Sequence, residues 1–249
     1  MESNRHFTAI VVGEAPDEIM KKYDLSEKVE PYVVYQLSEI PKYKENTLNA
    51  YKYLANSTVM PETIRDEYKA KVQEIEEMSD IDFYSKLTED LEIDEDTGNA
   101  MCDINPDGHY NICRLGKNLA MPLINKEDQE VFQARKRDIQ WNKIHLANQD
   151  VYRIAWEMVM ADRKPSNEEE EIIYENMKNR TEYFRYYGDI DTYVASNTAF
   201  WGYAFVTKDN WVELTDDIPQ IQWVTEFYDN FIKKLPEDTL ISVYECIRT

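Results

Sequence analysis

Apolar side chains recur with a helical period through much of the first half of the chain. The clearest stripe has apolar residues three or four positions apart, which predicts one face of an amphipathic helix. Its members are Ile64, Tyr68, Val72, Ile75 and Met78. The same pattern covers residues 42–92, so we expect a helical insertion there.

Short apolar segments at both ends of the chain, and one near its centre, predict strands instead. Residues 7–13 and 240–247 are rich in β-branched side chains, and residues 110–115 alternate apolar and polar positions. Residues 203–207 and 211–214 flank a three-residue loop, which predicts a hairpin. Each short strand needs neighbours for its backbone groups, so we expect all of them in one sheet.

Two signals predict further helices between the central strand and the hairpin. Asn125 is a suitable N-cap for a long helix that reaches about Ala161. Residues 166–169 read Ser-Asn-Glu-Glu, a capping-box pattern that opens another helix, and Gly188 would end it. We therefore expect a second helical insertion over residues 126–188.

The order of these elements predicts an α+β fold. The expected core is an antiparallel sheet of the ferredoxin-like, split βαβ type, formed by strands from both chain ends and the centre. It would comprise residues 1–41, 93–125 and 189–249, with the helical insertions 42–92 and 126–188 packed on or beside it. A chain of 249 residues suits one domain with insertions, or two small domains.

Composition favours a folded intracellular protein. A hydrophobic content of 43% is enough for a core, and no run approaches the roughly 20 apolar residues that span a bilayer. The first residues lack the basic and apolar regions of a secretion signal. Cys102, Cys113 and Cys246 are odd in number and scattered, so we expect free thiols and no disulfide framework.

The net charge is the most unusual property of the sequence. Asp and Glu number 49 against 28 Lys and Arg, which gives a formal charge of −21. Such a field repels nucleic acid and anionic membranes and attracts basic surfaces. Two interpretations stay open: general solubility, or an acidic surface that occupies the nucleic-acid-binding site of another protein.

One segment departs from this acidic background. Residues 110–165 hold 10 Lys and Arg against 7 Asp and Glu. Guanidinium and indole groups suit phosphates and bases, so the segment is a candidate contact for RNA, an anion or a protein partner. The alternative, which we favour, is a solvated helix face with pairs of opposite charge. The candidate residues are Arg114, Lys117, Lys126, Arg135, Lys136, Arg137, Trp141 and Lys143.

No catalytic or metal-binding motif is present. The sequence has no P-loop, GxSxG, GxGxxG, HExxH or CxxC pattern. His109 lies in a Pro-Asp-Gly turn, where a metal or general-base role is less expected than a plain polar turn. Residues from Asp94 onward resemble a calcium loop, but Asn99 and Asn105 occupy the Gly and Glu positions. We expect no cofactor, no metal and no enzymatic activity.

Six segments at both ends and in the centre of the chain form a recognisable set. They are residues 6–13, 29–32, 93–99, 105–110, 203–207 and 235–240. Together they resemble a family of uncharacterised tailed-bacteriophage proteins, over about half of the chain. The family's Gly-Gly-Arg-Trp-like signature is incomplete here, because residues 114–118 read Arg-Leu-Gly-Lys-Asn.

The resemblance implies a phage gene product that acts in the cytoplasm of an infected bacterium. With the charge and the absence of catalytic motifs, we expect a non-enzymatic inhibitor of host defence, of the anti-CRISPR or anti-restriction type. Its partner would be a defence protein or ribonucleoprotein complex, not a membrane. One alternative is an RNA- or nucleotide-binding module that uses residues 110–165. A third, least favoured, is an enzyme with a dispersed carboxylate or metal site.

Overall fold

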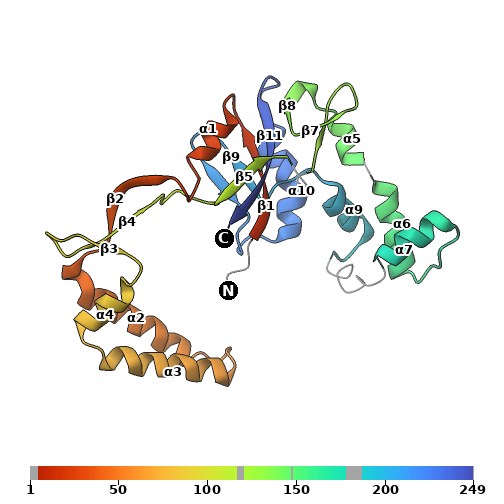
Figure 1. The fold of residues 1–249 in the computed structure, drawn as a ribbon. Helices are drawn as coiled ribbons and strands as arrows, with labels where there is room; N and C mark the ends of the chain where they lie inside the picture. The colour runs from red at the N-terminus through yellow and green to blue at the C-terminus, as the bar shows by residue number, and fades with distance from the viewer. Residues whose placement is uncertain (1–4, 117–120, 147, 178–186, 249) are drawn as a thin grey trace. The chain divides into compact units, whose positions relative to one another are not determined.

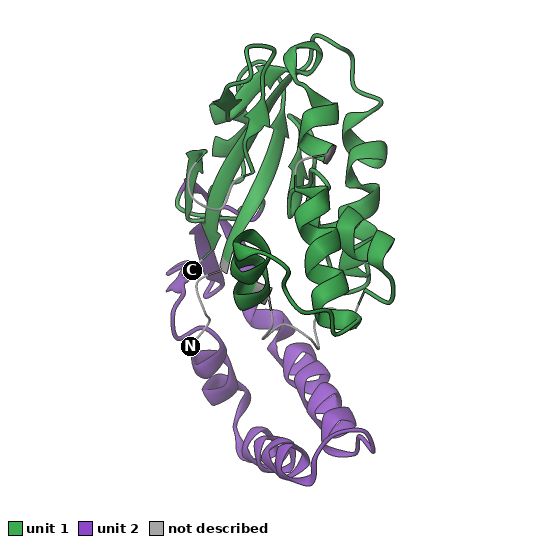
Figure 2. Ribbon diagram, turned by 90° about the vertical axis from the view of Figure 1, so that its right-hand side faces the viewer, with its two compact units in different colours: residues 1–26, 107–249 green, residues 27–106 purple. Residues whose placement is uncertain are grey.

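The computed structural model describes residues 5–116, 121–146, 148–177 and 187–248 (Figure 1). The protein is α+β, and it forms two compact units (Figure 2). Unit 1 comprises residues 1–26 and 107–249, and unit 2 comprises residues 27–106. These bounds differ from the predicted division, because the strands that flank the first helical insertion group with its helices.

The predicted strands from both ends and the centre do join one sheet, in unit 1. The strand order is β10-β9-β1-β11-β5, and β8 also pairs with β11. The strands are β1 (Arg5–Val12), β5 (Ile112–Leu115), β8 (Gln133–Arg135), β9 (Ala204–Val206), β10 (Trp211–Glu213) and β11 (Leu240–Arg248).

The sheet is mixed, whereas the sequence predicts an antiparallel one. β1 pairs antiparallel with β11 but parallel with β9, where Ala9 lies opposite Ala204. A tight hairpin forces two strands to be antiparallel, but the long chain between β1 and β9 sets no such constraint. The hairpin between β9 and β10 is confirmed, and Thr207 N–H donates to the Asn210 carbonyl across its loop.

Helices cover both faces of β1, so consecutive residues of this strand are buried. Ile10 packs on one face with α10 (Gln220–Phe227), and a π-helical turn, Tyr228–Ile232, continues that helix. Val11 packs on the other face with Met20 of α1 (Pro16–Lys21). Both side chains are fully buried. A strand that is covered on both faces needs apolar side chains at successive positions, which explains why the sequence of β1 is a continuous apolar run.

The predicted long helix from Asn125 is wrong in its first part. Asn125 follows β6 (Leu123–Ile124), which pairs with β7 (Glu130–Val131). The Asn125 side chain accepts hydrogen bonds from the backbone N–H of Glu127 (3.0 Å) and Gln129 (2.9 Å). It therefore caps a turn, because Asn side chains satisfy turn amides as readily as helix amides. β8 follows and pairs with β11, so these residues belong to the sheet.

The described residues that follow contain further helices. The helices are α5 (Trp141–Leu146), α6 (Gln149–Met160), α7 (Glu168–Met177) and α9 (Ile190–Thr198). α7 begins one residue later than the predicted capping box, because Asn167 accepts the Glu170 N–H. Bonds from Arg163 and Ser166 lower the pKa of Glu170 to about 2. The predicted helix end at Gly188 depends on residues outside the described ranges.

Unit 2 contains a three-stranded sheet and a group of helices. Its sheet has the order β2-β4-β3, from β2 (Lys28–Tyr35), β3 (Glu92–Ile93) and β4 (Ala100–Ile104). The helical prediction for residues 42–92 is confirmed, as α2 (Ile40–Ala55), α3 (Glu62–Glu77) and α4 (Asp80–Leu87). Ser79 caps α4 by accepting the Asp82 N–H. Ile75, Phe83 and Ala100 form part of the core.

None of the helices in the described ranges is long and apolar enough to cross a membrane.

Candidate interaction surface

Most of the candidate cations in residues 110–165 lie in ion pairs. Lys126 Nζ is 3.1 Å from Asp138 Oδ1, and Arg137 lies 4.0 Å from the same carboxylate. The other pairs are Lys143 with Asp128, Arg135 with Glu14, and Lys136 with Glu237. Arg114 is exposed and, within the described ranges, in no ion pair; Lys117 lies outside those ranges. A phosphate at any of the paired cations would have to displace a carboxylate.

Lys136 is a structural residue of the fold. Its side chain is buried, at 6% exposure, and its Nζ donates to the carbonyls of Lys233 (2.9 Å) and Leu235 (2.7 Å). Glu237 completes the environment at 2.9 Å. The ammonium group thus satisfies carbonyls that the end of a helix leaves without partners.

Trp141 packs inward and does not present its ring for stacking on a base. Its ring centroid lies 5.3 Å from that of Phe200 and 5.0 Å from that of Tyr228. His145 lies beside the same Tyr228 ring at 4.7 Å, and burial lowers the pKa of this histidine. Trp141 Nε1 and His145 Nε2 are buried without a hydrogen-bond partner among the described atoms.

His109 belongs to an aromatic stack beside β10. Its ring lies parallel to the Trp211 indole, with centroids 4.4 Å apart, and its Nδ1 is 3.3 Å from Glu213 Oε2. Trp211 Nε1 donates to the same carboxylate at 2.8 Å. Both neighbours lower the pKa of Glu213, the His109 ring most strongly. Across the described ranges, no three His, Cys, Asp or Glu side chains are close enough to hold a metal ion.

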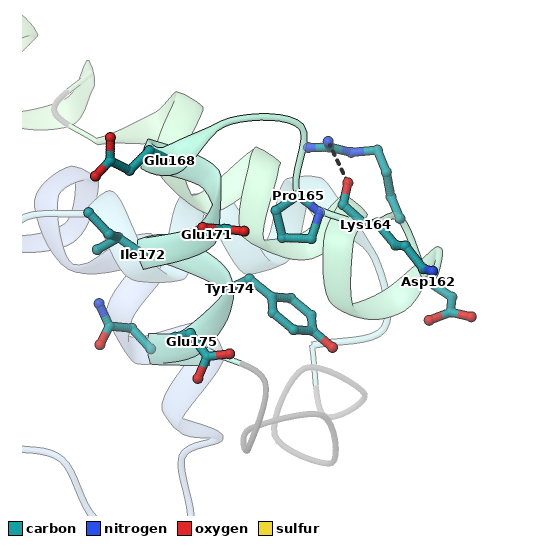
Figure 3. A pocket seen from close by; sticks show the side chains of 10 residues that line it. Asp162, Lys164, Pro165, Glu168, Glu171, Ile172, Tyr174 and Glu175 are labelled. Atoms are coloured by element: carbon teal, nitrogen blue, oxygen red, sulfur yellow. Dashed lines mark hydrogen bonds between the residues drawn. The ribbon is translucent and has the colours of Figure 1, made fainter.

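A hollow of the described surface in unit 1 is lined by several carboxylates. It measures about 980 Å³ and lies along α7 and the preceding loop. Figure 3 shows Asp162 and Glu168 at opposite sides of it, with Pro165 and Tyr174 between them. A metal or acid–base site needs such groups a few ångströms apart. Asp162 and Glu168 therefore do not form such a pair.

A smaller pocket of about 280 Å³ lies between the helices of unit 2. Ile75, Phe83 and Leu87 line its apolar part, with Lys86 and Lys71 at its rim. Lys86 pairs with Glu74 at 2.5 Å, and Lys71 Nζ lies over the rings of Tyr51 and Tyr68. The volume is at the lower end of the range for small-molecule sites.

Several unpaired carboxylates lie in a segment of unit 2 that we call the acidic hairpin, residues 89–99. It runs from the end of α4 through β3 to the turn before β4. Residues 87–113 contain eight Asp and Glu and no Lys or Arg. The exposed carboxylates of the hairpin form no ion pair within the described ranges. They belong to Glu89, Asp90, Glu92, Glu95 and Asp96.

The turn of the acidic hairpin has a defined geometry. Asp94 Oδ1 accepts the backbone N–H and the hydroxyl of Thr97, each at 2.7 Å, and these bonds lower the pKa of Asp94. Gly98 has φ +70°, and a Cβ there would lie 2.9 Å from Leu37. The turn therefore holds the flanking carboxylates in fixed positions and requires glycine at this point.

Exposed apolar side chains accompany these carboxylates. Ile93 is 44% exposed in β3, and Leu37, which lies against Gly98, is 46% exposed. The backbone N–H of Leu37 donates to the Asn99 side chain at 3.0 Å, which ties this residue to the hairpin. Apolar groups bordered by charged ones are the usual anatomy of a protein interface.

Comparisons with known proteins give no match: no family model, no curated protein and no solved structure is similar to this chain.

The sequence indicates an acidic turn at residues 94–99 but not the interface around it. Leu37 and the hairpin are far apart in sequence, and the fold brings Leu37 beside Gly98 and Asn99 while Ile93 pairs with Ala100. The sequence also does not reveal the ion pairs of the basic segment, because Glu14 and Glu237 lie far in sequence from their partners Arg135 and Lys136. The absence of Lys and Arg from residues 87–113 is the one sequence signal that could have located the surface.

Proposed function

We propose that this chain is a non-enzymatic binding protein whose acidic hairpin occupies the basic, nucleic-acid-binding surface of another protein. The observation that carries the proposal is the group of exposed, unpaired carboxylates on a rigid turn beside Ile93 and Leu37. Carboxylates at fixed positions can take the place of phosphates against Lys and Arg, and the apolar neighbours add contact area.

The charge of unit 2 supports this assignment. Its 80 residues hold 19 Asp and Glu against 8 Lys and Arg, a balance of −11. A field of this sign accelerates encounter with a cationic surface by roughly 10- to 1,000-fold, and salt weakens the effect. The same field repels nucleic acid itself, so the expected outcome is competition with DNA or RNA for the partner.

Neutralising the hairpin should weaken partner binding. We expect the triple variant Glu92→Gln, Glu95→Gln, Asp96→Asn to associate about tenfold more slowly at low salt, because three steering charges are lost. Asp94 is left intact, since it holds the turn. The measurement is the association rate on the immobilised partner over a range of salt concentrations.

A matched control changes the same number of charges elsewhere. The variant Glu168→Gln, Glu169→Gln, Glu171→Gln removes three exposed carboxylates of α7 in unit 1. Its association rate should stay within about twofold of that of the unmodified chain, because these carboxylates contribute only to the long-range electrostatic field. Equal losses for the two variants would mean that net charge, and not the hairpin, drives binding.

The partner class that we propose is a host defence complex that handles nucleic acid, of the CRISPR or restriction type, in the bacterial cytoplasm. What supports it is the acidic surface; the choice of a defence complex follows the resemblance to tailed-phage proteins that the sequence suggests and that belongs to this proposal. The test is capture with the tagged chain from lysate of infected bacteria, followed by identification of the bound proteins. Recovery of no defence or nucleic-acid-processing protein would count against this class.

RNA or nucleotide binding through residues 110–165 remains the second candidate, favoured by the exposed guanidinium of Arg114. The ion pairs of Lys126, Arg135, Lys136 and Lys143 reduce the charge available for phosphate. We therefore expect the purified protein to carry no nucleic acid, with a 260/280 nm absorbance ratio typical of protein, and to leave labelled RNA unbound at low salt. Saturable RNA binding that an Arg114→Ala variant loses would reverse this preference.

An enzyme with a dispersed carboxylate site is the third and weakest candidate. Its support is limited to the abundance of acidic residues, because Asp162 and Glu168 lie at opposite sides of the hollow along α7 (Figure 3).

We further propose that the main sheet is a variant of the ferredoxin-like, split βαβ arrangement. β10 and β11 both run antiparallel to the central pair β9 and β1, which separates them, and α10 joins them in sequence. In the usual split βαβ unit, one strand lies between the two strands that the helix joins. Here two strands, β9 and β1, lie between β10 and β11, and they run parallel to each other. Cross-strand amide contacts between β1 and β9 in solution would test the pairing.

A further inference from the structure

Two cysteines that the sequence leaves far apart meet across the main sheet. Cys113 of β5 lies directly opposite Cys246 of β11 in the antiparallel register. Their sulfur atoms are 3.3 Å apart, with the Cys246 thiol donating to Cys113. A disulfide needs a separation of about 2.0 Å, which modest side-chain rotation can supply when the strands already place the residues opposite each other.

The surroundings give the two thiols different roles. Cys246 is fully buried, whereas Cys113 is half-buried on the last strand at that side of the sheet. The hydrogen bond to Cys113 and then burial raise the pKa of Cys246 while both thiols are reduced. Access therefore favours Cys113 as the thiol that reacts first with a dissolved reagent.

We propose that Cys113 and Cys246 form a reversible disulfide by exchange with a low-molecular-weight disulfide such as oxidised glutathione. The Cys113 thiolate attacks one sulfur of that disulfide, which forms a mixed disulfide and releases one glutathione thiol. Cys246 then loses its proton and attacks Cys113 Sγ, releasing the second glutathione. Two protein thiols become one disulfide, and one oxidised glutathione becomes two reduced molecules.

The cross-link would secure the segment by which the chain re-enters unit 1. That segment is already anchored: His109 N–H donates to the Tyr23 carbonyl at 2.7 Å, and the Tyr110 hydroxyl to the Met20 carbonyl at 2.7 Å. A covalent bond between β5 and β11 would keep this segment next to the sheet even when the hydrogen bonds of His109 and Tyr110 break. Oxidation would therefore stabilise unit 1 against unfolding.

The test is oxidation of the full chain in glutathione buffers of increasing oxidising ratio, followed by alkylation and mass spectrometry. We expect Cys113 and Cys246 to become protected from alkylation together, and a non-reducing digest to contain the β5 and β11 peptides cross-linked. Cys102 should stay alkylatable or carry glutathione. Dithiothreitol should restore both thiols, and the urea midpoint should be higher in the oxidised form.

Two variants make the result specific. Cys102→Ser should leave the protection of the pair unchanged, and Cys113→Ser should leave Cys246 alkylatable, once the chain is unfolded, at every glutathione ratio. The proposal is overturned if Cys113 and Cys246 stay alkylatable under conditions that glutathionylate Cys102. It is equally overturned if the cross-link found joins Cys113 to Cys102, or joins two chains.

Discussion

Phe227→Ala should lower the free energy of unfolding of unit 1 by about 3–5 kcal/mol. Phe227 is fully buried where α10 meets the sheet, and its ring centroid lies 5.1 Å from that of Phe231 and 5.7 Å from that of Trp223. Truncation removes apolar contact and leaves a cavity that rigid neighbours fill only in part. Domains are stable by roughly 5–15 kcal/mol, so this loss is a large fraction of the total. The measurement is urea unfolding followed by circular dichroism.

The comparison variant is Ile172→Ala, at a position that is 61% exposed on α7. It deletes an apolar side chain of the same unit without creating a cavity, so the urea midpoint should stay close to that of the unmodified chain. If Phe227→Ala shifted the urea midpoint no more than Ile172→Ala does, the result would contradict the described packing of α10 on the sheet.

Lys136→Met should cost about 3 kcal/mol of stability, since it removes a buried ammonium group from three acceptors. Methionine keeps the length and apolar stem of the side chain, so the loss reports the hydrogen bonds to Lys233 and Leu235 and the pair with Glu237. Urea unfolding again measures the effect.

Lys234→Met provides the matched exposed position, because Lys234 follows the same helix end with its side chain in solvent. We expect it to leave the urea midpoint unchanged. A Lys136→Met protein with normal stability but weakened RNA binding would favour the nucleic-acid role that the sequence suggests for this residue.

The local elements of this fold could be predicted because their signals are contiguous. The apolar stripe from Ile64 to Met78 predicts α3, and the three-residue loop after Thr207 predicts the hairpin of β9 and β10. Asn125 misled the prediction because a cap for a turn and a cap for a helix use the same side-chain chemistry. The parallel pairing of β1 with β9 has no local signal at all.

The candidate surface was predictable only as charge. Composition located the acidity and the basic segment, but it could not show that Arg135 pairs with Glu14 or that Lys136 is buried. Those facts depend on which distant segments the sheet brings together. The Cys113–Cys246 contact is hidden for the same reason, since 132 residues separate the two thiols in sequence and one register position joins them.

Displacement of nucleic acid from a defence complex tests the central claim most directly. Fluorescence anisotropy would follow labelled target DNA on purified guide-RNA-loaded CRISPR effectors and restriction enzymes of the host, as the protein is added. We predict release of DNA from at least one of these complexes, weakened by salt and by the Glu92→Gln, Glu95→Gln, Asp96→Asn variant but not by the α7 control. DNA that stays bound at low salt in every complex, or equal release by the hairpin variant, would contradict the account.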